Sequence, residues 1–325
     1  RPEPWNIGAS LLLGRYLAWV GEAGAATQLV AAAALAVGEE EALRAMSGDL
    51  PLGKPGHWEK QERAPLLELL RLLLASGARL GVGGDRVWAL SGEHTESGSA
   101  LLSALTSSPP VLPALWHPIH LLALDATYEV AGAAVPGFPG VILGRNASVA
   151  WSLTVAPYSS QGLLQLPWSA PADEAAATAA AATAASATAE AMSGSGAEAA
   201  GAAAGYGLRS SVESIRVRGQ TTPLHQKVWR SADGPRLDTG LVSLERPLIL
   251  QWDGLQPGDD LASILALDRA HDVAEALAAF SDETPIPLQC VAADRAGTIG
   301  YRLIARPPMS PPSLLPQRAA VDPAV

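Results

Sequence analysis

The segment that most constrains the fold runs from residue 130 to residue 154, VAGAAVPGFPGVILGRNASVAWSLT. Its apolar runs are short, and glycine, proline and asparagine residues lie between them. Short runs rich in β-branched and aromatic residues that end at such turn residues indicate strands. Similar runs lie at 87–92 and 127–135, so we predict that short strands dominate the chain from residue 85 onward.

Residues 1–80 show a different pattern, which predicts helices. Large apolar residues recur at helical spacing between Leu11 and Val20. The segment 65–77, PLLELLRLLLASG, begins with proline and ends with glycine, residues that favour the two ends of a helix. The glycines of 81–84, GVGG, then interrupt the helical pattern, so a helical region precedes the strand-rich region.

Two segments have a biased composition. Residues 172–205 consist mostly of small residues, chiefly alanine. Alanine favours helices, but a segment with so few larger apolar groups has little surface to pack. We therefore expect a surface insertion at 172–205 and an extended, proline-rich tail at 307–325.

The charge and the apolar runs limit the classes of function. The chain carries 22 lysine and arginine residues against 32 aspartate and glutamate residues, a formal net charge of −10. This balance argues against nucleic acid and anionic membranes as partners, because both attract basic surfaces. The longest apolar run, Leu29–Val37, is far shorter than the roughly 20 residues of a membrane span. The single cysteine, Cys290, excludes an internal disulfide bond.

Three segments together resemble the penicillin acylase family of N-terminal-nucleophile amidohydrolases. Segment 130–154 is similar to the family's AGxxxPGxPGxxxGxN stretch and the AWxxT that follows it. Segment 250–280 resembles the family's tryptophan-containing strand and leucine-rich helix, and 287–308 resembles QNxxYADxxGxIGYxxxGxxP. The resemblance implies an α+β fold, an αββα sandwich of two antiparallel sheets between helical layers. It also implies a small-chain-like helical segment at 1–84 and a large-chain-like core at 85–325.

The resemblance covers most of the 325 residues but only part of a typical member, which is far longer. We therefore expect a fragment of a longer protein, whose partner is a protein subunit or a missing C-terminal part of the same chain. Family members are often periplasmic or secreted. No signal peptide is visible in this chain, so the sequence predicts no compartment.

The family's catalytic positions carry other residues here. In the family, a serine, cysteine or threonine after a glycine becomes N-terminal by self-cleavage and then attacks the amide, with its own amine as base. Asp85 holds this position, and a carboxylate cannot perform the N-to-O acyl shift of self-cleavage. The resemblance places the oxyanion asparagine at Gln289, or at Cys290 if the alignment slips by one residue. Arg306 matches an arginine that many members carry.

Other polar features of the family are also missing. The family's NDPH segment aligns with Ala104–Ser107, and the acids of metal-binding members have no counterpart in 157–162, PYSSQG. His117 and His120 have a spacing that suits metal ligands on a helix, but Pro118 lies between them in an expected extended segment. We therefore expect neither a metal ion nor a cofactor.

Several residues keep two interpretations. Asp85 is either a new catalytic acid or a turn residue, and Gln289 is either an oxyanion donor or an ordinary strand residue. Cys290 is either a nucleophile or a small core residue. The last alternative concerns three tryptophans, which either line an acyl pocket or belong to the core: Trp88, Trp116 and Trp151.

These observations support a penicillin-acylase-like protein without the standard amidase activity, which acts as a binding or structural subunit. Its ligand would be a small acyl or amide compound. The alternative is an active amidohydrolase that cleaves a linear amide by an altered site. If the protein is an enzyme, we expect Asp85, Gln289 and Arg306 to converge in an open pocket. If it is a pure scaffold, we expect side chains such as Leu105 or Leu112 to fill that pocket.

Overall fold

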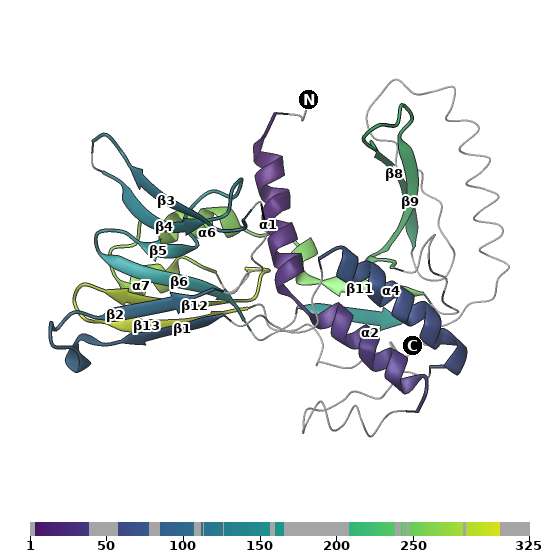
Figure 1. Ribbon diagram of the computed structural model, residues 1–325, viewed down its shortest axis with the longest axis horizontal. Helices are drawn as coiled ribbons and strands as arrows, with labels where there is room; N and C mark the ends of the chain where they lie inside the picture. Colours follow the sequence, from purple (N-terminus) through teal and green to yellow (C-terminus); the bar gives the residue numbers. More distant parts are fainter. Residues whose placement is uncertain are drawn as a thin grey trace, which may run out of the picture. The chain divides into compact units, whose positions relative to one another are not determined.

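The computed structural model divides the chain into two compact units (Figure 1). The first unit contains residues 1–24, 77–160 and 253–309, and the second unit contains 25–76, 161–252 and 310–325. The structure describes residues 4–38, 58–77, 85–106, 112, 114–125, 127–156, 160–165, 208–237, 242, 244, 247–281 and 284–305.

A six-stranded antiparallel sheet forms the centre of the first unit. Its strand order is β13-β12-β6-β5-β4-β3, so the last two strands of the chain pair beside β6. Leu153 of β6 lies opposite Cys290 of β12 in this register. The strands are β3 (His117–Leu122), β4 (Glu129–Ala134), β5 (Leu143–Arg145), β6 (Val149–Val155), β12 (Leu288–Asp294) and β13 (Ile299–Ile304).

Helices cover one face of this sheet and a β-hairpin covers the other. Alternate residues of β6 and β12, such as Trp151 and Cys290, lie in a buried cluster with residues of α6 (Asp260–Leu267) and α7 (Val273–Ala278). The hairpin of β1 (Arg86–Leu90) and β2 (Leu101–Leu105) contacts β6 and β12 but contributes no residue to that cluster. It therefore forms a second sheet on the opposite face, and the unit has a helix–sheet–sheet order (Figure 1).

The other helices in the described part of the first unit are α1 (Ile7–Gly21) and the short η2 (Gly92–His94) and η3 (Asp253–Leu255). The side chain of Asn6 caps α1 by accepting a hydrogen bond from the backbone N–H of Ala9 (3.0 Å). Gly14 lets α1 approach the core closely, since a Cβ there would lie 2.7 Å from a ring carbon of Phe138. Any larger residue at Gly14 would push the helix outward.

The second unit combines helices with two small antiparallel sheets. Strands β7 and β11 pair with each other, and β8, β9 and β10 form a three-stranded sheet. Gln161 and Gln28 join β7 to α2, because Gln161 accepts from the N–H of Ala25 (3.1 Å) and Gln28 accepts from that of Leu163 (2.8 Å). The elements are α2 (Gly24–Leu35), η1 (Lys60–Glu62), α4 (Arg63–Ala75), β7 (Gln161–Gln165), β8 (Arg209–Ile215), β9 (Leu224–Ser231), β10 (Gly234–Pro235) and β11 (Leu248–Trp252).

The predicted α+β class is confirmed by these helices and antiparallel sheets. The helix predicted at 65–77 is α4, and the residue that follows its last turn, Gly77, has a positive φ of 99°. The insertion at 172–205 and the tail at 307–325 lie outside the described residues. The boundary at residue 84 remains a prediction. Within the described part of the chain, no helix has the length and hydropathy to cross a membrane.

The glycine-rich stretch before β5 has a structural role. Gly140 adopts a φ of 92°, a conformation that glycine accepts without strain, and a side chain there would collide with Ile264 of α6. The carboxylate of Asp268, just after α6, accepts hydrogen bonds from the N–H of Val141 (3.2 Å) and from the Tyr128 hydroxyl (3.0 Å). Glycine at this position thus allows the loop to contact the helix layer directly.

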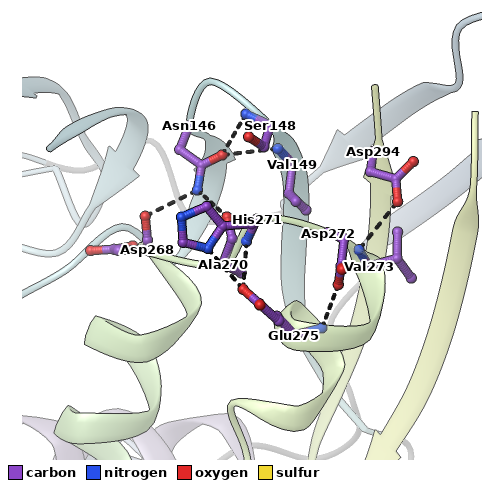
Figure 2. A network of polar contacts seen from close by, with 10 residues as sticks. All are labelled: Asn146, Ser148, Val149, Asp268, Ala270, His271, Asp272, Val273, Glu275 and Asp294. Carbon is purple, nitrogen blue, oxygen red and sulfur yellow. Dashed lines mark hydrogen bonds and ion pairs between the residues drawn. The ribbon is translucent and has the colours of Figure 1, made fainter. Parts of the chain in front are cut away.

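Asn146 joins the same two parts of the fold (Figure 2). Its Nδ2 donates to the carbonyls of Asp268 (3.1 Å) and Ala270 (2.8 Å), in the loop between α6 and α7. Its Oδ1 accepts from the backbone N–H groups of Ser148 (2.8 Å) and Val149 (2.9 Å), at the start of β6. The side chain therefore satisfies four backbone groups and attaches the β5–β6 turn to the helices.

The Asn146→Ala substitution is expected to lower the free energy of unfolding by about 2–4 kcal/mol, because it removes four hydrogen bonds in a partly buried turn. Chemical denaturation followed by circular dichroism measures this change. Asn6→Ala is the matched control: it removes one exposed capping bond and is expected to cost only about 1 kcal/mol. Equal losses in the two variants would contradict the role given to Asn146.

Candidate functional site

The first unit contains an apolar cavity of about 170 Å³. Its walls come from α1, β6, α6 and the segment that leads into β12. Small residues on one side of α1, Gly14, Ala18 and Gly21, leave room for it. Larger apolar residues complete the walls: Leu17, Trp116, Phe138, Leu153, Ile264 and Phe280.

Asp85 lines this cavity together with Thr106. Because Arg86 pairs with Leu105 in the hairpin, residues 85 and 106 lie opposite each other at its open end. The hydroxyl of Thr106 donates a hydrogen bond to Oδ1 of Asp85 (3.2 Å). Both residues are half-buried. The Asp85 carboxylate therefore lies beside a hydroxyl group at the cavity wall.

Two further acids line the cavity, and both are engaged. The carboxylate of Glu22 is buried and accepts from the N–H of Ser160 (2.8 Å) and from its hydroxyl (2.9 Å). Asp260 forms an ion pair with Arg15 (3.1 Å). Burial raises the pKa of Asp260, and the positive charge of Arg15 opposes that rise. These two side chains anchor the cavity wall to its surroundings.

Gln289 is not among the residues that line the cavity. Its Nε2 donates to the carbonyl of Val155 (3.4 Å), and its Oε1 accepts from the hydroxyl of Tyr301 (3.2 Å). The amide group is therefore engaged with the sheet. Arg306 lies outside the described residues. Of the two described candidates, Asp85 lines the cavity and Gln289 does not.

Cys290 belongs to the buried cluster between the six-stranded sheet and the helices. Desolvation raises the pKa of its thiol to about 12, although Arg302 opposes the rise. The thiolate is the reactive form of cysteine, so a thiol in this environment is inert near neutral pH.

The three tryptophans occupy different environments. Trp116 lines the cavity. Trp151 is buried in the core, where its indole N–H donates to the carbonyl of Val141 (3.0 Å). Trp88 is 55% exposed on the outer face of the hairpin.

The histidines of β3 show no metal-site geometry. His117 is exposed, and His120 contacts the Glu129 carboxylate (3.1 Å). The described part of the chain contains no group of three or more histidine, cysteine, aspartate or glutamate side chains that could hold a metal ion.

Two features of the cavity were not singled out from the sequence. The first is Thr106, which lines the cavity and whose polar side chain was the available signal in the sequence. The second feature is the indole N–H of Trp116, which is buried and has no hydrogen-bond partner among the described residues. No pattern in the sequence indicates that unpaired donor, because it depends on how the side chains pack.

The chain belongs to the penicillin amidase family, whose sequence model matches residues 1–323. It is similar to the acyl-homoserine lactone acylase QuiP of Pseudomonas aeruginosa, with 25% identity over 248 residues, which cover 72% of this chain and 26% of that protein. QuiP of Pseudomonas syringae pv. tomato is 31% identical over 97 residues, 30% of this chain and 12% of that protein. The chain thus spans about a quarter of the length of the Pseudomonas aeruginosa relative.

Among solved structures, a thermostable penicillin G acylase from Alcaligenes faecalis is similar to this chain. The TM-score is 0.48 at 20% sequence identity, and the match covers 68% of this chain and 35% of that chain.

Cys290 is expected to resist iodoacetamide in the folded protein at about pH 8, because its thiol is buried and its pKa is about 12 rather than the ordinary value of about 8.5. It should react once guanidinium unfolds the chain. Mass spectrometry of the intact protein measures the labelling. The variant Ser97→Cys, in an exposed loop, provides a control thiol that should react in the folded state. Labelling of Cys290 at the rate of that control would show that the thiol is accessible.

Proposed function

We propose that this protein binds a small apolar acyl or amide group in the cavity and does not carry out the amide hydrolysis of an N-terminal nucleophile. The observation that carries the proposal is the position of Asp85 at the wall of an apolar cavity. The sequence resemblance aligns this residue with the family's nucleophile. A carboxylate has no hydroxyl or thiol for self-cleavage and is a weak nucleophile toward an amide. The apolar cavity remains able to bind such a group.

The open cavity favours a binding subunit over a pure scaffold. The side chains that would fill the cavity in a scaffold are turned to solvent, with Leu105 60% and Leu112 95% exposed. An engineered apolar cavity of about 150 Å³ holds a benzene molecule. The cavity of about 170 Å³ therefore suits one aromatic ring or a short alkyl chain.

The relatives support an acyl group as the apolar part of the ligand, because their names describe acylases of acyl-homoserine lactones. The alternative of an amidohydrolase with an altered site has less support, since the amide of Gln289 is engaged with Val155 and Tyr301. We also propose that 1–84 and 85–325 correspond to the small-chain and large-chain regions. The protein would then act as one subunit or part of a larger assembly, consistent with the 26% share of the relative that it spans.

The purified chain is expected to remain a single uncut polypeptide, because Asp85 cannot initiate the acyl shift between residues 84 and 85. Mass spectrometry of protein expressed without protease exposure measures this. The same preparation should release no phenylacetate from phenylacetamide. Two fragments that meet between residues 84 and 85 would overturn the proposal.

Neutral phenylacetamide is expected to bind the wild-type protein, and Ala18→Leu is expected to weaken binding by about tenfold or more. The larger side chain occupies the cavity and excludes the ring, whose burial contributes about 1.5–3 kcal/mol. Isothermal titration calorimetry gives the affinities. Ala9→Leu, on the same helix but outside the cavity wall, should bind like the wild type. Absence of binding to the wild type, or equal affinity for both variants, would contradict the proposed site.

A further inference from the structure

We infer that Thr106 is a replacement nucleophile at the cavity wall, with the Asp85 carboxylate as its general base, and that it accepts acyl groups from esters of small apolar acids. The inference rests on the proposed function, because the cavity must first bind the acyl group. It differs from the family mechanism in two respects: the chain stays uncut, and no free α-amine takes part.

The geometry of the pair meets the requirement for an activated hydroxyl. Thr106 Oγ1 lies 3.2 Å from Asp85 Oδ1 and donates to it, a separation within the range for a nucleophile and its base. Both side chains line the same apolar cavity. The pairing of Arg86 with Leu105 in the adjacent strands holds the two residues opposite each other, so the strand pairing maintains the contact.

Trp116 supplies a donor for the negative charge that develops on the carbonyl oxygen. Its indole N–H is buried, lies in a residue of the cavity wall and has no acceptor among the described residues. Buried donors without a partner are rare in folded proteins, and each calls for a physical explanation. An oxyanion of a bound ester would provide the missing acceptor, as in other acyl-transfer sites.

The proposed reaction needs only the ester and water as reactants, and it yields the free acid and the alcohol. Thr106 Oγ1 forms a bond to the carbonyl carbon while the Asp85 carboxylate takes the hydroxyl proton. The bond from that carbon to the alcohol oxygen then breaks, and the departing oxygen receives the proton from Asp85. Water subsequently hydrolyses the acyl-threonine to the free acid and regenerates the hydroxyl. Esters with a good leaving group suit this pair because a phenolate leaves without prior protonation, whereas an amine does not.

The test uses p-nitrophenyl phenylacetate, whose acyl ring matches the cavity volume. The wild-type protein is expected to release a burst of p-nitrophenol and to gain the mass of one phenylacetyl group. Peptide mapping should place that group on Thr106. Asp85→Asn should slow the burst by about 100-fold, the contribution typical of a general base.

Variants at Thr106 separate chemistry from folding. Thr106→Val, close in shape, should abolish the adduct, and Thr106→Ser should retain it because the hydroxyl remains. Thr95→Val removes a hydroxyl from the same hairpin, outside the cavity wall, and should react like the wild type. Circular dichroism and thermal unfolding establish that each variant is folded.

The outcomes distinguish this inference from the proposed function. If the wild type binds phenylacetamide but forms no phenylacetyl adduct, Thr106 is not a nucleophile and the binding function stands. An adduct on another residue, or one that persists in folded Thr106→Val, also overturns the inference. If phenylacetamide does not bind, the proposed function fails and the inference fails with it.

Discussion

The four hydrogen bonds of the Asn146 side chain connect the β5–β6 turn to the loop between α6 and α7. Much of the first unit depends on this connection, because it sets the position of the helix layer on the six-stranded sheet. Ile264 on α6 is also a wall residue of the cavity. The same side chain that completes a turn therefore helps to determine the shape of the site. Buried backbone groups need partners, and here one amide supplies four of them.

The cavity itself results from the small residues of α1. Gly14, Ala18 and Gly21 lie on the side of the helix that faces the core, and they let the helix approach without filling the space beneath it. The walls are apolar, and the carboxylates are placed where other groups hold them: Glu22 by Ser160 and Asp260 by Arg15. An apolar cavity whose carboxylates are held by hydrogen bonds or ion pairs is suited to bind the apolar end of a small molecule.

Asp85 adds a carboxylate to the wall of this cavity. Its carboxylate accepts a hydrogen bond from the Thr106 hydroxyl across the hairpin. The paired strands of a hairpin bring together residues that are distant along the chain. The residue before β1 therefore supplies the carboxylate and the residue after β2 supplies the hydroxyl. The two side chains thus form a hydrogen-bonded pair at the cavity wall.

The sequence by itself determined the fold class and the family. Those features depend on local patterns: helical spacing before residue 80, short strands between turn residues after it, and motifs such as that at 130–154. Only the tertiary structure decided that Trp116 rather than Trp88 or Trp151 lines the cavity, that Cys290 is buried, and that Gln289 is bonded to the sheet. It also brought Asp85 to Thr106. Strand order, register and the packing of side chains far apart in sequence fix these contacts, and no local pattern carries that information.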